Sequence, residues 1–214
     1  MRWMIKDKTL SNYLTACRFA ELQTFKQDRR LQKIFEHCTE EAAKNYLKII
    51  GPHLINNDFT NDNYGSPDIH IGYRFSFSTL QYIAVVKMLV DNFGSLNDLR
   101  IVEIGGGYGG QCRTIMDIYR PSQYHIIDLP EPCELQRRYC EAECFTEPTG
   151  KKYDLCISNY ALSEIIDNKP YIDEVLRRSK HGYITCNTDF VTLPWEHKRI
   201  PDISGEPNNF ILIW

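Results

Sequence analysis

The sequence lacks the features that mark several large classes of protein. No apolar run approaches the ~20 residues that a membrane-spanning helix needs. Lys and Arg number 25 against 28 Asp and Glu, so the formal net charge is -3. A slightly acidic chain has no broad basic footprint for sequence-independent binding of nucleic acid. We therefore expect neither a membrane nor a nucleic acid among the partners of this protein.

The N-terminal residues also lack the charged and then apolar pattern of a signal peptide. The eight cysteines include a Cys140-x3-Cys144 pair, but no second pair or nearby histidine completes a zinc site. We therefore expect a cytoplasmic protein with reduced cysteines and no metal site. Carboxylates after residue 186 are chemically compatible with a divalent metal, but their spacing gives no ligand pattern.

The first part of the chain has helical periodicity. Residues 9–50 place apolar side chains on helical stripes, and Gly51-Pro52 predicts the end of that region. The polar, turn-rich stretch at 56–67 predicts a loop. We therefore predict an N-terminal helical region and linker over residues 1–70.

A different pattern follows. Residues 78–81 (Ser-Thr-Leu-Gln) predict a capping box, and the helix that they begin is expected to end near Gly94. From about residue 98, apolar strands alternate with helices, one of them about ten residues long after Pro130. The expected strands are 99–104, 124–127, 153–158, 183–186 and 210–214, with a vestigial strand or loop at 144–146.

This alternation predicts an α/β fold over residues 71–214, with a doubly wound and mostly parallel sheet behind an N-terminal helical extension. The stretch between Cys140 and Tyr153 has little room for a full strand. We therefore expect a sheet that is shortened at that point, which leaves open whether the core forms a complete enzyme.

The most informative segment is 101–111, where a predicted strand runs directly into glycines at 105, 106, 107, 109 and 110 and then into a helix. Glycine lets a ligand approach the backbone closely, and the helix start offers unpaired N–H groups. Asp128 ends the next predicted strand at the ~20-residue spacing that suits a ribose-binding acid. Together they predict a site for an adenosine-containing cofactor.

Two cofactor classes fit the glycines. Gly105, Gly107 and Gly110 satisfy G-x-G-x-x-G, the dinucleotide fingerprint, whereas Glu103, Gly105, Gly107 and Gly109 satisfy E-x-G-x-G-x-G. A carboxylate at 103 suits the ammonium group of a methionine moiety and suits a pyrophosphate badly. We therefore favour S-adenosylmethionine, and a nicotinamide-dependent oxidoreductase is the alternative.

The second pattern resembles the first motif of class I S-adenosylmethionine-dependent methyltransferases. The resemblance narrows to the sugar O-methyltransferase family and covers about residues 65–214. It rests on segments 78–82, 102–111, 126–132, 157–164 and 209–214. It implies a Rossmann-like fold and a set of cofactor-binding residues. These are Glu103, Gly105, Gly107, Gly109, Asp128, Leu129, Ser158 and Asn159, with Thr79 as a weaker candidate for the methionine carboxylate.

Acceptor-side residues should follow the third clear strand. Tyr160 and Glu164 lie one helical turn apart, so both can face one pocket. Glu164 is the first choice for a general base, Tyr160 could stack on a sugar ring, and His197 is a second-rank candidate.

The predicted function is methyl transfer from S-adenosylmethionine to a hydroxyl of a sugar or sugar nucleotide (EC 2.1.1). One alternative is a methyltransferase that acts on a nitrogen or oxygen of another small molecule. A second is a non-catalytic module that binds the cofactor. The N-terminal helices could form a lid or a homodimer interface, and the sequence does not choose between them.

Overall fold

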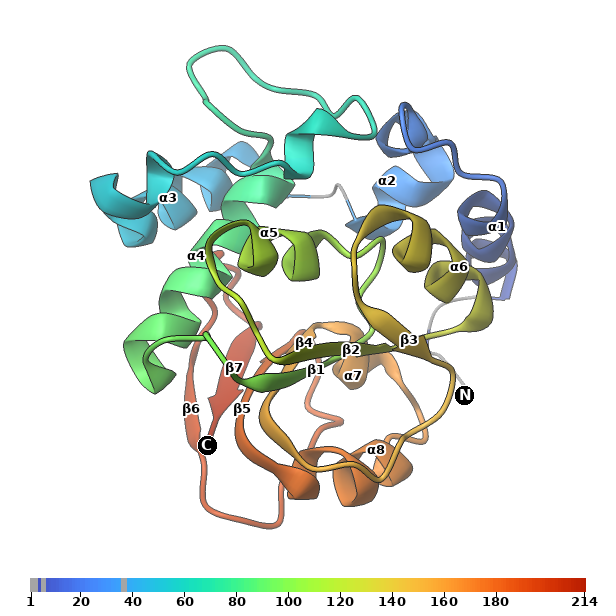
Figure 1. Cartoon of the computed structure of the whole chain (residues 1–214), viewed down its shortest axis with the longest axis vertical. Coiled ribbons are helices and arrows are strands. Elements are labelled where there is room, and N and C mark those ends of the chain that lie inside the picture. The colour runs from blue at the N-terminus through green and yellow to red at the C-terminus, as the bar shows by residue number, and fades with distance from the viewer. Residues whose placement is uncertain (1–3, 5–6, 36–37) are drawn as a thin grey trace.

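The computed structural model describes residue 4, residues 7–35 and residues 38–214. The chain forms an α/β fold with helices on both faces of one sheet, and its N-terminal helices gather over one face (Figure 1). No helix among the described residues is long and apolar enough to cross a bilayer.

The sheet has seven strands in the order β3-β2-β1-β4-β5-β7-β6. The first five are parallel, and β7 runs antiparallel to both β5 and β6. This arrangement confirms the predicted doubly wound and mostly parallel fold. The strands are β1 (Arg100–Ile104), β2 (Gln123–Ile127), β3 (Glu143–Phe145), β4 (Tyr153–Asn159), β5 (Ser179–Cys186), β6 (Lys198–Pro201) and β7 (Phe210–Ile213).

The vestigial strand expected at 144–146 is present as β3, so the sheet does not lack a strand at that point. β3 is only three residues long, but it pairs in parallel register with β2 from His125 to Ile127. The strand β6 was not predicted, because its pattern is polar and mostly exposed and shows no apolar alternation. It pairs with β7 and closes that edge of the sheet.

The chain has eight α-helices and three short 3-10 helices among its described residues. They are α1 (Asp7–Arg18), α2 (Arg29–Phe35), α3 (Glu40–Ile55), α4 (Phe77–Phe93), α5 (Gly110–Ile118), α6 (Pro130–Tyr139), α7 (Ala161–Glu164) and α8 (Lys169–Glu174). Short 3-10 turns lie at η1 (Phe25–Gln27), η2 (Asn61–Asn63) and η3 (Leu176–Arg178).

Two helix boundaries differ from their predictions. Gly51 does not end α3; it adopts φ 69° and kinks the helix, which continues from Pro52 to Ile55. A proline is tolerated there because the first turn after a kink needs no N–H donor. In α4 the capping residue is Ser76 rather than Ser78, because the Ser76 side chain accepts a hydrogen bond from the backbone N–H of Thr79. The end of α4 at Gly94 agrees with the prediction.

Alternation along the strands separates the core into two layers. Ile101 of β1 faces a cluster formed with α1, α2, α4, α5 and α6, whereas Val102 faces a second cluster formed with α7 and α8. α3 packs on α4 in a third cluster around Tyr46 and Phe77. Because Tyr13 and Phe35 belong to the first cluster, the N-terminal helices share the apolar core of the sheet.

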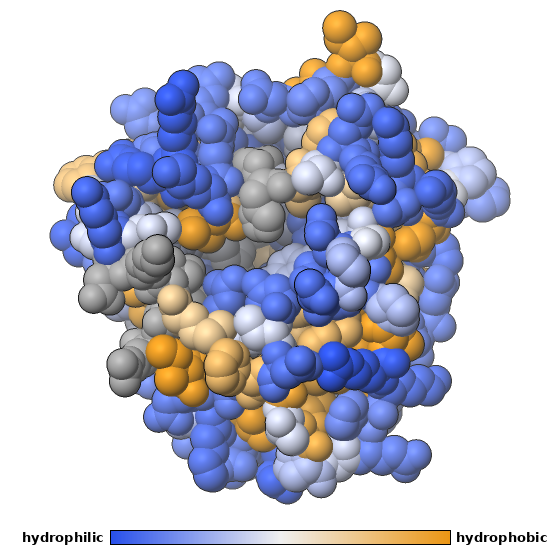
Figure 2. Space-filling model, turned by 180° about the vertical axis from the view of Figure 1, so that it is seen from behind, coloured by the Kyte–Doolittle hydropathy of each residue, from blue (hydrophilic) through white to orange (hydrophobic). Residues whose placement is uncertain are grey.

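The surface has mixed polarity. On the face shown in Figure 2, hydrophilic side chains cover most of the surface, and apolar side chains are interspersed among them. The most exposed large apolar side chains are Ile71, Phe19 and Phe190.

Candidate functional site

A cavity of about 340 Å³ lies at the carboxyl ends of β1, β2 and β4. Residues from α1, α2, α3 and α4 line it, together with the glycine turn after β1, the ends of β2 and β4 and the loop at 204–209. In doubly wound sheets, ligands bind in the crevice at this end of the strands. The cavity also falls within the ~300–1,000 Å³ range of small-molecule sites.

The glycine turn forms part of the cavity wall. Gly105 and Gly107 line the cavity with φ values of 70° and 58°, a left-handed conformation that favours glycine. The Gly105 backbone N–H donates to the carbonyl of Ile127 at 2.9 Å, which extends the β1–β2 pairing. The Gly109 N–H donates to the carbonyl of Gly106 at 2.8 Å, which closes the turn. Gly109 has a different place: it precedes α5 with φ 96° and does not line the cavity. Two of the three predicted glycines therefore reach the site.

Glu103, the penultimate residue of β1, lines the cavity. Its side chain is 2% exposed, and the Tyr124 hydroxyl donates to Oε2 at 2.8 Å. Burial raises the pKa of Glu103 to about 7; the Tyr124 hydrogen bond partly offsets this, and the nearby Asp128 charge adds to it. A cationic ligand would stabilise the ionised form of this buried carboxylate.

Asp128 lies on the same cavity wall, directly after β2. Its carboxylate accepts hydrogen bonds from the Leu129 backbone N–H and from Gln136 Nε2, both at 2.8 Å. Burial raises the pKa of Asp128 to about 6, although hydrogen bonds from Leu129, Gln136 and the backbone N–H groups of the glycine turn oppose the rise. Gln136 also donates to the carbonyl of Gly107 at 2.9 Å, so α6 ties this carboxylate to the turn. Leu129 lines the cavity beside it.

The two predicted residues at the end of β4 have different roles: Ser158 is structural, and Asn159 lines the cavity. Ser158 is fully buried; its hydroxyl donates to the carbonyl of Ile104 and accepts from the Leu162 N–H, so it fastens β4 to β1 and α7. It does not line the cavity. Asn159 does, and its Nδ2 donates to Gln111 Oε1 at 3.2 Å. Asn159 Oδ1 is buried and has no hydrogen-bond partner among the described residues, so it is an acceptor to which a bound ligand could donate.

Tyr160 and Glu164 both line the cavity, as their spacing predicted. Tyr160 takes φ 66° where the chain leaves β4, and its hydroxyl donates to Asp202 Oδ2 at 2.7 Å. Burial, followed by the charge of Asp202, raises the pKa of Tyr160, so the phenol stays neutral. Glu164 is half-buried and accepts a hydrogen bond from Asn187 Nδ2 at 2.9 Å through Oε1.

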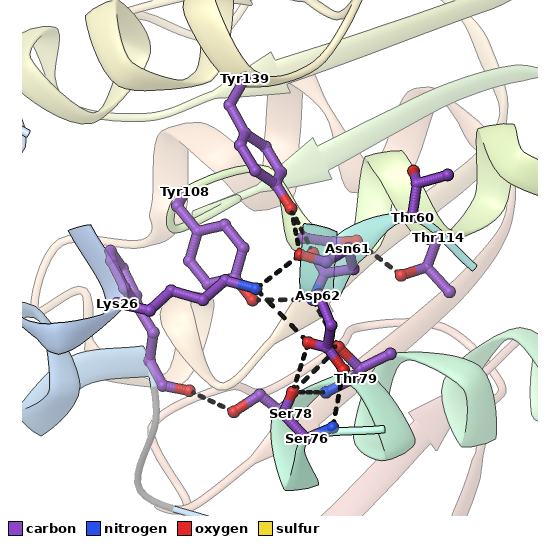
Figure 3. A network of polar contacts seen from close by, with 12 residues as sticks. Lys26, Thr60, Asn61, Asp62, Ser76, Ser78, Thr79, Tyr108, Thr114 and Tyr139 are labelled. Carbon is purple, nitrogen blue, oxygen red and sulfur yellow. Dashed lines mark hydrogen bonds and ion pairs between the residues drawn. The ribbon is translucent and has the colours of Figure 1, made fainter. Parts of the chain in front are cut away.

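Thr79 and His197, like Gly109 and Ser158, do not line the cavity. The hydroxyl of Thr79 is fully buried and donates to Asp62 Oδ1 at 2.7 Å in a separate polar network (Figure 3). Because Ser76 caps α4, Thr79 belongs to its first turn and faces this network. His197 lies on the exposed segment before β6, where Nδ1 pairs with the carbonyl of Trp195. The structure therefore places neither side chain at the cavity.

The network around Thr79 braces the glycine turn from behind. Lys26, which is 1% exposed, donates to the carbonyl of Asn61 at 2.8 Å, and its ammonium lies 4.9 Å from the centre of the Tyr108 ring (Figure 3). Asn61 also donates to the Tyr108 hydroxyl at 3.1 Å. Because Tyr108 lies between Gly107 and Gly109, this network fixes the turn to the N-terminal region.

The residues that sequence reasoning missed come from segments distant in the chain. Tyr46 of α3 and Ser204 line the cavity beside Tyr160, and Asp202 holds Tyr160 from behind. Asp202 and Ser204 lie between β6 and β7, a hairpin that the sequence did not reveal. No local pattern marked these residues.

The charged side chains that line the cavity, among the described residues, are all acidic. Its described lining residues include four acidic side chains and no Lys, Arg or His. The acidic residues are Glu103, Asp128, Glu164 and Glu206. Within the described ranges, no group of three or more His, Cys, Asp or Glu side chains is arranged to hold a metal ion. The cavity is therefore suited to neutral or cationic groups rather than to anions.

Comparisons with known proteins give only distant likenesses. No protein-family model matches the chain, and no curated protein matches it. Among solved structures, a Thermoplasma acidophilum protein is 16% identical with a TM-score of 0.45, over 64% of this chain and 88% of that one. An S-adenosylmethionine-dependent methyltransferase from Mesorhizobium loti is 18% identical with a TM-score of 0.37, over 50% of this chain and 55% of that one.

Coclaurine N-methyltransferase, in a structure bound to N-methylheliamine and SAH, is 10% identical with a TM-score of 0.43. The match spans 85% of this chain and 53% of that one. The chain thus covers only about half the length of the two methyltransferases. At these identities and TM-scores, the likenesses support no statement about substrate or mechanism.

Proposed function

We propose that this chain is an S-adenosylmethionine-dependent methyltransferase that acts in the cytoplasm on a small molecule. The observation that carries the proposal is the convergence of three features on one cavity. The glycine turn of β1, the buried Glu103 and the buried Asp128 all line it at the carboxyl ends of parallel strands. Residues 71–214 would supply the cofactor site, and residues 1–70 would cover it.

The residues present fit this cofactor better than a dinucleotide. Glu103 and the unpartnered Asn159 Oδ1 are acceptors suited to an ammonium group, and Asp128 is placed to accept hydrogen bonds from ribose hydroxyls. The described cavity residues include no basic side chain to neutralise a pyrophosphate. This charge pattern disfavours the oxidoreductase alternative.

The cofactor would supply a methyl group activated by a positively charged sulfur. The protein then has to align an acceptor oxygen with that methyl group and remove the proton from the acceptor hydroxyl. Glu164 is the best-placed base, since it lines the cavity and Asn187 holds one of its oxygens. Tyr160 offers a neutral ring against which a sugar could stack. We therefore propose a sugar hydroxyl as the acceptor.

Calorimetry tests the cofactor proposal directly. We expect S-adenosylmethionine and its demethylated product, S-adenosylhomocysteine, to bind at one site and NAD not to bind. Asp128→Ala should abolish this binding while circular dichroism shows a folded protein. Asp91→Ala, an exposed substitution on α4, is the matched control. Binding of NAD alone, or unchanged affinity of Asp128→Ala, would overturn the proposed cofactor site.

Turnover tests the acceptor proposal. A panel of sugars incubated with methyl-labelled cofactor should give a labelled, O-methylated product. Glu164→Gln should depress the rate of transfer more than the affinity for cofactor, because it removes the base and leaves the cofactor contacts. Full activity of Glu164→Gln would remove it from the role of base.

A further inference from the structure

We propose that the acceptor binds as an organic cation, a small hydroxylated compound with an ammonium group such as an amino sugar. Phosphorylated and nucleotide-linked sugars are then poor acceptors. The inference rests on the proposed function, because it assigns the end of the cavity that the cofactor leaves for the acceptor.

The first step is to separate the two ends of the cavity. Glu103 lies in β1 and Asp128 directly follows β2, and the proposed cofactor accounts for both. Glu164 on α7 and Glu206 in the loop before β7 also line the cavity, and neither is assigned to the cofactor. The acceptor end therefore carries acidic side chains of its own.

The Glu164 carboxylate has one oxygen available to accept a hydrogen bond from a ligand. Its Oε1 is held by Asn187 Nδ2 at 2.9 Å, which orients the carboxylate. Its Oε2 accepts no hydrogen bond from any described residue, and the residue is half-buried. An ammonium group could donate to this oxygen, and partial burial makes such a charged bond stronger than it is in bulk water.

Two tyrosines supply the second part of a cation site. Tyr46 of α3 and Tyr160 at the end of β4 both line the cavity. Burial raises the pKa of both phenols, which keeps their rings neutral. Neutral aromatic faces beside carboxylates are the usual surroundings of bound organic cations.

A phosphate at this end would lack any counter-charge among the described residues. Neither Lys, Arg nor His from the described part of the chain lines the cavity. Burying a phosphate beside Glu164 would add repulsion to the cost of removing its water. A neutral sugar is not repelled by the carboxylates, and an ammonium group is attracted to them.

The test uses the whole chain saturated with S-adenosylhomocysteine and measures the binding of glucosamine, glucose and glucose 6-phosphate by calorimetry. The pH is chosen so that the amine is protonated. We expect glucosamine to bind several-fold more tightly than glucose, and glucose 6-phosphate to bind most weakly. Added salt should narrow the difference.

Charge-removing variants identify the groups responsible. Glu164→Gln and Glu206→Gln should each weaken glucosamine binding. Glu206→Gln, which removes a charge but not the proposed base, should leave glucose binding unchanged. Glu134→Gln, an exposed change on α6, is the matched control and should alter neither. Failure of S-adenosylhomocysteine to bind would refute the proposed function. If it binds but glucosamine binds no more tightly than glucose, or if neither sugar binds, the cation proposal alone is overturned.

Discussion

The hydroxyl of Tyr160 lies 2.7 Å from Oδ2 of Asp202, and this hydrogen bond joins the end of β4 to the loop that connects β6 and β7. Asp202 is 6% exposed and also accepts a hydrogen bond from the Ser204 hydroxyl. Asn45 of α3 in turn donates to the carbonyl of Ser204 at 3.0 Å. Three distant segments therefore meet behind one aromatic ring of the cavity.

We predict that Tyr160→Phe lowers stability by about 2 kcal/mol, because the buried Asp202 loses a hydrogen-bond donor. Urea unfolding measures this loss. In kinetic assays the KM of the acceptor should rise while the affinity for cofactor stays constant, since Tyr160 lies at the acceptor end. Tyr119→Phe, whose ring is away from the cavity, is the control. An unchanged acceptor KM would show that the Tyr160 hydroxyl has only a structural role.

The stability of the ligand-free protein should fall as the pH rises from about 4.5 to about 7. Burial raises the pKa of Glu103 from 4.5 to about 7, so within this window the folded protein binds a proton that the unfolded chain releases. Its neutral form therefore stabilises the fold at low pH, and this contribution, about 3 kcal/mol, is lost as the pH rises through 7. Urea unfolding at several pH values measures it.

Glu103→Gln should remove this part of the pH dependence, because glutamine stays neutral. Asp128 contributes a similar slope at lower pH, since its pKa is raised from 3.8 to about 6. Asp128→Asn therefore serves as the comparison. A Glu103→Gln variant with the slope of the unmodified protein would contradict the raised pKa of Glu103.

Cofactor affinity should have the opposite pH dependence. A cationic ligand prefers the ionised form of Glu103, so its association constant should increase by up to about tenfold per pH unit below pH 7 and level off above it. Calorimetry in buffers of different ionisation enthalpy would also detect the proton that binding releases. In Glu103→Gln the affinity should be weaker and nearly independent of pH across that range.

Gly107→Ala tests the glycine turn. A side chain at φ 58° costs about 1–2 kcal/mol. Its Cβ would also lie 3.2 Å from the Phe35 ring, which covers the turn. Gly150→Ala is a matched control, because Gly150 has φ 63° but no atom within 4 Å of the added Cβ. We expect Gly107→Ala to lose at least as much stability as Gly150→Ala, and only Gly107→Ala to lose cofactor affinity in calorimetry. Equal cofactor affinity in the two variants would show that binding does not need a glycine at 107.

The sequence predicted those features that depend on neighbouring residues. Glu103, the glycines and Asp128 lie in one strand–turn–helix–strand unit, and local patterning was enough to find them. Asp202 and Tyr46 reach the site only through the packing of a hairpin and of α3, which no periodicity encodes. Thr79 was misplaced for a related reason. Both Ser76 and Ser78 are residue types that cap helices, and the Ser76 backbone N–H donates to Asp62 Oδ2, which holds Ser76 in the capping position.

Lys26→Met tests whether the polar network behind the glycine turn supports the cofactor site. The ammonium of Lys26 is buried 3.7 Å from Asp62 Oδ1, so its removal leaves a carboxylate without its counter-charge and should cost about 3 kcal/mol in urea unfolding. Lys33→Met, an exposed change on α2, should cost almost nothing. Because Lys26 and Asn61 hold Tyr108 within the turn, cofactor affinity should also fall in Lys26→Met, although Lys26 does not line the cavity. A destabilised variant with undiminished affinity at a temperature where it is fully folded would show that the network supports the fold alone.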